Sequence, residues 1–261
     1  MKKILFFDYD GTLVDEKEKI HEISEIMKHT LNMCREQEYV IVLCTGRALS
    51  YIPKKVFELN FDAYISANGA YVEVNHKQLV SYAFTKEECL SFQKDMKQLD
   101  CLCFLEGNQH CFIENMEDEA FKKFVKHYDI PTDRFTNKFD YSEVITKFTV
   151  FCKDKEYIKT YLLKHGYHFN FHNYGISCDI VKKGISKAKG MQAICDYFHV
   201  DKKDTIAFGD GSNDYEMLKY AGVGVMMKHH HSSLEEVADD ICDSCANEGI
   251  TKFLYEKKLI K

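Results

Sequence analysis

Two acidic residues stand directly behind an apolar run near the start of the chain. The stretch KILFFDYDGTLVD, residues 3–15, places Asp8 and Asp10 after four apolar residues, and Gly11 follows. In an extended backbone the i, i+2 spacing sends both carboxylates to the same side. Carboxylates this close repel each other, so the pair calls for a cation with oxygen ligands, above all Mg²⁺. Acids of a simple turn or helix cap are the alternative interpretation of this segment alone.

Polar groups also follow other apolar runs that read as strands. Thr45 and Gly46 follow YVIVLC and offer a hydroxyl and backbone N–H groups that suit a phosphate oxygen. Gly11 permits the sharp turn and close backbone approach that a phosphate requires. After the run DTIAF, Asp210 is placed to complete the oxygen shell of the metal, and Asp214 to orient Asp210 or a lysine.

Four further residues are candidates for contact with substrate or phosphate. Lys187 lies just inside an expected helix start, where its ammonium would neutralise the charges of phosphate and nucleophile together. Arg47 either touches substrate or pairs with a neighbouring carboxylate, and the two readings are equally supported. Asn68 lies between a strand end and a glycine, which suits a turn as well as a ligand contact. Asn213 belongs to the same acid-rich loop as Asp210.

The order of expected elements indicates how these residues are positioned. Residues 1–81 and 183–261 alternate short apolar runs with amphipathic segments, which predicts a parallel sheet with helices on both faces. One predicted helix carries apolar residues from Ile20 to Cys34 at helical spacing. Ligands of such open sheets bind outside the carboxyl ends of the strands, and the polar clusters fall there.

The middle of the chain, residues 82–182, has a different pattern. A hairpin-like pair, CLCFLEGNQHCFIE, alternates with amphipathic helices such as EDEAFKKFVKHY and KEYIKTYLLKHG. This pattern predicts a separate α+β domain with an antiparallel sheet, inserted into the first domain. In YHFNFHNYG, aromatic and polar residues alternate. We expect the aromatic face to pack against helices and the polar face to meet water or substrate.

Composition limits the class of partner. The 261 residues are 45% apolar and carry a net charge of −6, with 35 basic residues spread along the chain, which argues against nucleic acid. No apolar run reaches the roughly 18 residues of a membrane span. The eleven cysteines are odd in number and irregularly spaced, and MKKILFF lacks the features of a signal peptide. We therefore expect reduced thiols and a soluble, cytoplasmic protein, whose oligomeric state the sequence does not indicate.

Two metal-like motifs have weaker support. In KHHHSS, three consecutive histidines cannot all face one ion without distortion. Cys242 and Cys245 form a C-x-x-C motif without a second pair, and the acids around them disfavour a thiolate. We interpret the histidines as loop residues and the cysteines as buried or idle thiols.

Taken in order, Asp-x-Asp-Gly-Thr, Thr-Gly, a lysine before a helix and Gly-Asp-x-x-Asn-Asp resemble the haloacid dehalogenase-like (HAD) hydrolase superfamily, and its Cof-type (type IIB) subfamily in particular. The likeness extends through ISANGA, GISKAKGM and NEGITKFL and so covers the chain. It implies an α/β fold with a Rossmann-like parallel sheet core and an inserted α+β cap domain. The family usually carries Met-Gly-Asn-Ala where this chain has Met227 followed by Lys228, His229 and His230, so the contact made by the family's asparagine is not carried over.

The resemblance also implies a reaction. Asp8 would attack phosphorus and form an aspartyl phosphate, and Asp10 would act as general acid and then general base. Mg²⁺ would be bound by the Asp8 carboxylate, the Asp10 backbone carbonyl and Asp210, while Thr45 and Lys187 hold the other phosphoryl oxygens. The implied function is that of a Mg²⁺-dependent phosphatase of small phosphorylated metabolites, such as sugar phosphates or phosphorylated cofactors.

Three other functions are compatible with parts of the pattern. A phosphomutase needs the same groups but shields the aspartyl phosphate from water. A phospho-accepting signalling module also places acids, a threonine and a lysine around Mg²⁺, although such modules are about half this length and lack an acid like Asp10. A non-catalytic binding protein would be expected to lose Asp8 or Asp10, and both are present.

Overall fold

The chain forms two compact units. The computed structural model describes residues 3–127, 130–140, 142–172 and 177–261. The first unit comprises Met1–Thr45, Pro53–Val80 and Ser186–Lys261, and the second comprises Gly46–Ile52 and Ser81–Ile185. The division into domains 1–81, 82–182 and 183–261 stays a prediction. The sequence did not indicate that Gly46–Ile52 groups with the second unit.

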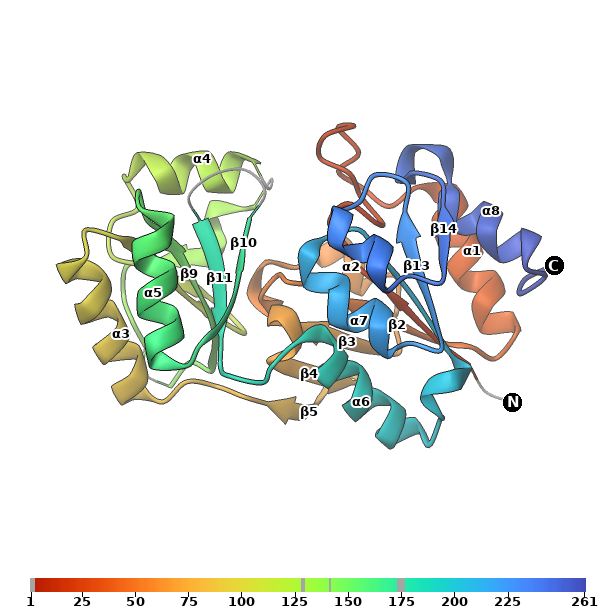
Figure 1. Cartoon of the computed structure of the whole chain (residues 1–261), viewed down its shortest axis with the longest axis horizontal. Coiled ribbons are helices and arrows are strands. Elements are labelled where there is room, and N and C mark those ends of the chain that lie inside the picture. The colour runs from red at the N-terminus through yellow and green to blue at the C-terminus, as the bar shows by residue number, and fades with distance from the viewer. Residues whose placement is uncertain (1–2, 128–129, 141, 173–176) are drawn as a thin grey trace. The chain divides into compact units, whose positions relative to one another are not determined.

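An eight-stranded sheet forms the centre of the first unit (Figure 1). Its strands lie in the order β14-β13-β12-β1-β2-β3-β4-β5. Their bounds are β1 Ile4–Phe7, β2 Val40–Cys44, β3 Ala63–Ser66, β4 Tyr71–Val74, β5 Lys77–Ser81, β12 Thr205–Gly209, β13 Val223–Met227 and β14 Asp240–Cys242. The six strands from β14 to β3 pair in parallel, and β4 is antiparallel to β3.

The parallel strands are covered on both faces, which explains their continuous apolar sequences. All residues of β1, β2, β3 and β12 are buried. In the register of the sheet, Phe7 lies opposite both Leu43 and Phe208, so β1, β2 and β12 end at the same edge. The residues that follow these three strands are thereby brought to one side of the sheet, as the sequence predicted.

Helices pack on both faces of this sheet. Their bounds are α1 Glu25–Glu36, α2 Lys54–Phe57, α6 Lys187–Phe198, α7 Tyr215–Tyr220 and α8 Gly249–Glu256. Apolar residues of α6 and α7, including Met191 and Leu218, pack on the face that carries Phe6 and Val42. On the other face, α1 and α8 lie side by side (Figure 1), joined by a 2.9 Å hydrogen bond between the hydroxyls of Thr30 and Thr251.

One helix begins later than its apolar pattern predicted. Ile20 pairs with Asp15 in a short antiparallel bridge, and α1 starts only at Glu25. The Asp15 carboxylate accepts backbone N–H groups of the intervening turn, and the Ser24 hydroxyl accepts the N–H of Met27 as the helix N-cap. Side-chain acceptors therefore end the turn and start the helix, which apolar periodicity alone does not show.

The second unit is built on a six-stranded sheet with the order β10-β11-β9-β6-β7-β8. Its strands are β6 Leu102–Gly107, β7 Cys111–Ile113, β8 Phe135–Thr136, β9 Ile145–Phe151, β10 His168–Phe171 and β11 Ser177–Val181. Among the strands that the structure describes, four of the five pairings are antiparallel, as the hairpin pattern predicted, and β7 pairs with β8 in parallel.

Three helices cover the second sheet: α3 Lys86–Gln98, α4 Glu119–His127 and α5 Lys155–His165. Helices α3 and α5 pack over one face (Figure 1), where Phe92 and Leu162 meet Phe148. The aromatic residues of β10 and the preceding residue pack into the same cluster, as expected from their alternation. The other face meets α4 through Phe104 and Phe121.

Within the ranges that the structure describes, no helix combines the length and apolar character needed to cross a bilayer.

Candidate active site

The predicted acids meet at the common edge of three strands of the first sheet. Asp8 follows β1, Thr45 follows β2, and Asp210 follows β12, and these strands are neighbours. The backbone continues the sheet pairing past the strand ends, since the N–H of Asp8 donates to Phe208 and the N–H of Thr45 to Ile65. Parallel register therefore brings together residues that lie far apart in the sequence.

A buried lysine links two of these acids. The Lys187 ammonium donates to Asp8 Oδ1 at 2.5 Å and to Asp214 Oδ1 at 2.6 Å. Its exposed fraction is 0%, and Asp214 is equally buried. Lys187 is the first residue of α6, directly after the N-cap Ser186. The start of this helix thus places a cation against the acid that ends β1.

The second carboxylate oxygen of Asp214 holds the loop after β12. Asp214 Oδ2 accepts the N–H groups of Asp210 and Gly211, both at 2.9 Å. Both oxygens of Asp214 are therefore engaged, one by Lys187 and the other by backbone. Asp214 thus contacts both groups named in the prediction, which had it orient Asp210 or a lysine, and that role stays a prediction.

Asp210 completes a compact group of acids. Ligand oxygens of Asp8, Asp210 and Asp214 all lie within 4.8 Å of one another. The Thr12 hydroxyl donates to Asp210 Oδ1 at 3.1 Å. Gly11 has a φ of +91°, and a Cβ there would lie 2.1 Å from Asp210 Oδ2. The turn therefore requires glycine both for its left-handed backbone and for the close approach of Asp210.

The electrostatics of the group show an excess of negative charge. Burial, followed by the neighbouring Asp214 carboxylate, raises the pKa of Asp8 to about 7 even though Lys187 opposes the shift. Burial and the charge of Asp8 raise the pKa of Asp210 well above its usual value. Burial alone would lower the pKa of Lys187, but Asp214 and Asp8 outweigh it and raise that pKa. One ammonium does not balance three carboxylates.

These residues fit a divalent cation with oxygen ligands. Carboxylate oxygens of Asp8 and Asp210 lie close to each other, so the two charges repel. A hard cation such as Mg²⁺ between them would relieve this repulsion. The Asp10 side chain is not a member of the acid group found among the described residues. Only the backbone carbonyl of Asp10 was predicted as a ligand, so its ligation stays a prediction.

Asp10 lies in a tight turn after β1. Asp10 pairs with Val14 in a short parallel bridge, and the N–H of Gly11 donates to the Val14 carbonyl at 2.7 Å. Asp10 is partly exposed, whereas Asp8 is buried. The turn thus leaves one of the two paired acids accessible to solvent while the other is held by Lys187.

The turn after β3 brings two more candidates together. Asn213 Nδ2 donates to Asn68 Oδ1 at 2.9 Å. Ala67, Asn68 and Gly69 all have positive φ, a conformation that is costly for alanine and that concentrates at functional sites. A Cβ on Gly69 would lie 2.1 Å from the Ser186 carbonyl oxygen. This close approach connects the turn to the start of the helix that carries Lys187.

Six of the ten predicted site residues lie together in two groups. The structure brings together Asp8, Lys187, Asp210 and Asp214 in one group, and Asn68 with Asn213 in a second contact. Gly46 and Arg47 belong to the second unit, although Gly46 is bonded directly to Thr45. Arg47 is buried, with 7% of its surface exposed.

Two neighbouring hydroxyls had no predicted role. Thr12, the threonine of DYDGT, contacts Asp210, and the motif itself was the signal for it. Ser66 at the end of β3 is completely buried, and its hydroxyl has no hydrogen-bond partner among the described residues. Its position before the Ala67 and Asn68 turn was visible in the sequence, but its burial depends on packing.

The histidine and cysteine motifs do not form a metal site in the described part of the chain. His230 Nδ1 lies 2.7 Å from the Met227 carbonyl and His231 Nδ1 lies 2.8 Å from the Ser233 hydroxyl, so these rings turn toward their own loop. The N–H of His231 donates to the Asp210 carbonyl at 2.7 Å, which places this loop beside the acid group.

Both cysteines of the C-x-x-C motif are free thiols that contact other partners. Cys242 Sγ lies 3.3 Å from Met227 Sδ, and Cys245 Sγ lies 3.3 Å from the Leu13 carbonyl. Burial raises the pKa of each thiol to about 12. Neither is a thiolate at neutral pH, which supports their interpretation as idle thiols.

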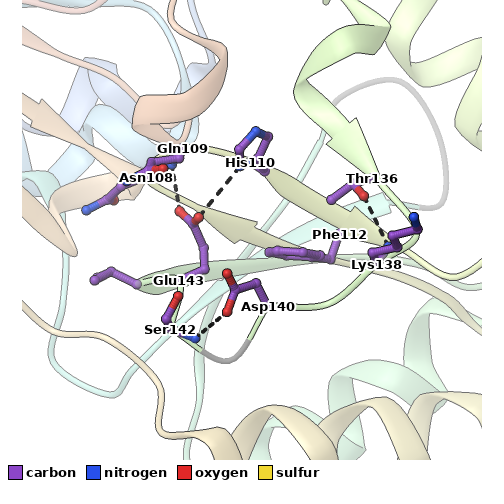
Figure 2. Close-up of a pocket in the computed structure, with 10 residues that line it drawn as sticks. Asn108, Gln109, His110, Phe112, Thr136, Lys138, Asp140, Ser142 and Glu143 are labelled. Carbon is purple, nitrogen blue, oxygen red and sulfur yellow. Dashed lines mark hydrogen bonds and ion pairs between the residues drawn. The ribbon is translucent and has the colours of Figure 1, made fainter.

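A separate pocket of about 360 Å³ lies within the second unit (Figure 2). Figure 2 shows Glu143 beside the turn after β6, where Glu143 accepts the N–H of Gln109 at 2.6 Å and lies 3.8 Å from His110 Nδ1. The sequence predicted no residue of this pocket as functional. Its lining is polar apart from Phe112 and Val144, so it suits a polar group.

Comparison with protein families matches nearly the whole chain to one of them. Residues 5–254 match the family of haloacid dehalogenase-like hydrolases. Among curated proteins, "Putative phosphatase YkrA" of Bacillus subtilis is 28% identical, and the alignment covers 99% of each chain. The 5-amino-6-(5-phospho-D-ribitylamino)uracil phosphatase YitU of Bacillus subtilis is 27% identical, over 97% of this chain and 96% of the relative.

Solved structures show the same fold along the full length. The subclass IIB sugar phosphatase BT4131 of the HAD superfamily superimposes with a TM-score of 0.84 and 25% identity, covering 99% of this chain and all of the other. This likeness confirms the predicted Rossmann-like α/β core with an inserted α+β unit. The motifs, the fold and the family match agree, and the chain belongs to the haloacid dehalogenase-like hydrolases, among relatives of the Cof type.

Proposed function

We propose that this protein is a Mg²⁺-dependent phosphatase of small phosphomonoesters. The observation that carries the proposal is the buried contact of Lys187 with Asp8 and Asp214, beside Asp210, in a chain of the HAD-like hydrolase family. Two full-length relatives support the class of substrate, because one is named as a ribitylaminouracil phosphatase and another as a sugar phosphatase. Sugar phosphates and phosphorylated cofactors are the proposed substrates.

Asp8 is the proposed nucleophile. Its carboxylate attacks phosphorus while the bond from phosphorus to the ester oxygen breaks, so that an aspartyl phosphate forms. The Lys187 ammonium, 2.5 Å from Oδ1, favours the ionised carboxylate against the effect of burial. The same ammonium is placed to stabilise negative charge that develops on the phosphoryl oxygens.

Asp10 is the proposed proton carrier. In the first step its carboxylic acid protonates the leaving alkoxide, and in the second its carboxylate takes a proton from the attacking water. That water displaces the Asp8 carboxylate from phosphorus, which releases inorganic phosphate and restores both acids. The partial exposure of Asp10 is compatible with proton exchange with solvent between turnovers.

Asp8, Asp210 and the backbone carbonyl of Asp10 are the groups that would hold Mg²⁺. When bound, the cation supplies positive charge that offsets the excess of carboxylates and the charge of the phosphoryl group. Asp214 keeps Asp210 in place through the backbone N–H of that residue, and Thr12 does so through its hydroxyl.

The remaining candidates would bind the phosphoryl group or the substrate. Thr45 offers its hydroxyl, and Gly46 its N–H, at the end of β2. Asn68 and Asn213, which contact each other, are proposed to lie on the phosphate side of the site. Arg47 is proposed to contact substrate. The second unit is proposed as the cap domain that selects the leaving group, and the protein as cytoplasmic.

The test is phosphate release from an aryl phosphate, with and without Mg²⁺, by the wild-type chain and by Asp8→Asn. Wild type should require Mg²⁺, and Asp8→Asn should lose at least about 10⁴-fold in kcat because no covalent route remains. Asp100→Asn is a matched control, since Asp100 is exposed and has a φ of 51° that asparagine adopts readily.

Activity that survives Asp8→Asn would overturn the proposed nucleophile. Little free phosphate together with a need for a bisphosphate activator would identify a phosphomutase instead. A panel of phosphorylated sugars, nucleotides and cofactors, ranked by kcat/KM, then defines the substrate class.

A further inference from the structure

The second unit contains a buried ionic cluster that the proposed reaction does not use. At its centre, the Lys147 ammonium in β9 lies 3.0 Å from a carboxylate oxygen of Glu106 in β6 and 3.0 Å from one of Asp179 in β11. These strands are neighbours, and Lys147 lies directly opposite Glu106. The Thr149 hydroxyl, on the same face of β9, lies within hydrogen-bond distance of both carboxylates and can donate to one of them at a time. All four side chains are buried.

The Lys147 ammonium also holds the segment Gly46–Ile52, which belongs to the same unit. It donates to the backbone carbonyl of Gly46 at 2.9 Å and to the hydroxyl oxygen of Tyr51 at 2.9 Å. The Tyr51 hydroxyl in turn donates to Glu106. One lysine therefore holds this short segment near both of its ends.

Stability alone does not explain this cluster. Removing an ammonium and two carboxylates from water is costly, and apolar residues of similar volume often stabilise such a position as well or better. Lys147 provides a hydrogen-bond donor to the Gly46 carbonyl, which an apolar residue at the same position would not provide. Glycine has no Cβ, so its peptide planes rotate more freely than those of other residues. The hydrogen bond from Lys147 therefore restricts a residue whose backbone is intrinsically free to rotate.

A fixed carbonyl also fixes the N–H of the next residue. The peptide bond is planar, and none among the described residues is cis, so the N–H of Arg47 points opposite to the Gly46 carbonyl. Holding that carbonyl therefore sets the direction of the Arg47 N–H and limits the rotation of Gly46. Groups oriented in advance lose less conformational entropy when a ligand binds.

We propose that Lys147 is a positioning residue that orients the backbone of Gly46 and Arg47, directly after Thr45, for binding of a phosphoryl group. Asp179 and Tyr51 hold Lys147 in place for this purpose. The inference rests on the proposed function, because it assumes that this backbone meets phosphate. It differs from that function in that Lys147 itself touches no reacting atom.

The experiment compares two variants of the full chain. Lys147→Met combined with Glu106→Gln removes the donor to Gly46 and limits the unpaired negative charge that remains. Glu106→Gln alone disturbs the same cluster and retains that donor. Two quantities are measured: the inhibition constant of inorganic phosphate against an aryl phosphate, and amide hydrogen exchange in peptides that cover residues 45–52.

The double variant should raise the inhibition constant of phosphate about ten-fold and speed exchange in 45–52 by a similar factor. Glu106→Gln alone should stay within about two-fold of wild type in both, even where its thermal stability falls. Equal inhibition constants for the two variants overturn the proposal, since the cluster would then be structural only. Hydrogen exchange remains informative if wild type releases no phosphate, a result that would overturn the proposed function separately.

A milder pair of variants covers the case in which the double variant does not fold. Tyr51→Phe removes one hydroxyl that contacts both Lys147 and Glu106, and it should raise the inhibition constant of phosphate about three-fold. Tyr161→Phe is its matched control, because Tyr161 also donates to a carboxylate in this unit, Asp95, at 2.5 Å. Indistinguishable inhibition constants for these two variants overturn the proposal.

Discussion

Each unit of the molecule buries one lysine between two carboxylates, and the two clusters differ in how completely their charges are matched. In the first unit, Lys187 contacts Asp8 and Asp214, and Asp210 adds a third acid nearby. In the second unit, Lys147 contacts Glu106 and Asp179. Both lysines are almost fully buried, so burial does not distinguish the clusters.

The partners of the acids do distinguish them. Around Lys147, hydroxyls of Thr149 and Tyr51 donate to the carboxylates, and His172 Nε2 lies 3.1 Å from Asp179. Burial alone would raise the pKa of Asp179, but Lys147 and His172 outweigh it and lower that pKa. Burial raises the pKa of Glu106, so one acid of this cluster is shifted in each direction. Around Lys187, the pKa values of Asp8 and Asp210 are both raised.

This difference indicates that the Lys187 cluster is arranged for catalysis and that the Lys147 cluster positions neighbouring backbone. A group of acids whose negative charge is left in excess favours a cation, and the bound cation would then offset the negative charge of a phosphoryl group. A group whose acids already have donors can only hold neighbouring parts of the chain in place. Two lysines with the same number of acidic contacts therefore support different roles.

The largest expected contrast comes from removing each lysine. Lys187→Met should lower kcat/KM for an aryl phosphate about 10²–10³-fold, because it removes a charge aimed at the developing negative charge. Loss of Lys147, tested in the Glu106→Gln background, should cost no more than about ten-fold, because that lysine acts only through the backbone. The measurement is steady-state kinetics on folded, purified protein.

Lys189→Met is the control for the first of these changes. Lys189 lies on the same helix as Lys187, but it is exposed and contacts Gln192 at 3.1 Å. It should keep the activity of wild type. A loss no larger for Lys187→Met than for Lys189→Met would contradict the assignment of the first cluster to chemistry.

The sequence predicted the first cluster well and the second not at all. Asp8, Thr45 and Asp210 were visible because each follows a buried parallel strand, and parallel strands end at a common edge. Lys187 was visible because it begins a helix. In each case a local signal places the residue, and a general rule of sheet topology brings the residues together.

The second cluster depends on register between distant strands. Lys147 lies in ITKFTVF, where a lysine at alternating spacing reads as an ordinary solvent-facing strand residue. Only the pairing of β9 with both β6 and β11 places Glu106 and Asp179 beside it. Gly46–Ile52 likewise reads as the continuation of a strand of the first unit, and only packing assigns it to the second.

A second, smaller contrast concerns stability against pH without divalent cations. The folded-state pKa of Asp8 is raised to about 7, so its contribution to stability is present below the usual aspartate pKa and is lost as pH rises through about 7. Asp179, whose folded-state pKa is lowered, contributes stability above the usual value and loses it only at strongly acidic pH. Asp8 and Asp179 therefore lose their contributions to stability in opposite directions of pH.

Thermal unfolding at several pH values, with a chelator or with Mg²⁺, measures this contrast. With chelator, Tm should fall by a few degrees between about pH 5 and pH 8, and Mg²⁺ should restore most of it at the higher pH. Asp8→Asn should reduce the fall, because it removes one of the two acids, Asp8 and Asp210, whose pKa values are raised. A Tm at pH 8 that Mg²⁺ does not change would contradict the view that the acid excess serves a cation.

The smallest expected effect comes from Thr12, whose hydroxyl donates to Asp210 at 3.1 Å. Thr12→Val keeps the shape and removes this donor, so Asp210 is less firmly oriented toward the cation. Loss of a group that orients a metal ligand typically lowers the affinity for the metal by about 10–100-fold. We therefore expect Thr12→Val to need about ten-fold more Mg²⁺ for half-maximal activity. At saturating Mg²⁺, kcat should stay within about three-fold of wild type, since Thr12 touches no reacting atom.

Thr160→Val is the matched control for this change, because Thr160 is exposed and its hydroxyl donates to the Glu156 carbonyl within α5. It should leave the Mg²⁺ dependence unchanged. If Thr12→Val instead lowered kcat at every Mg²⁺ concentration and left the half-maximal concentration unaltered, Asp210 would not act through the cation. The acids of the first cluster would then only position neighbouring parts of the chain, as those of the second do. The two lysines would no longer differ in role.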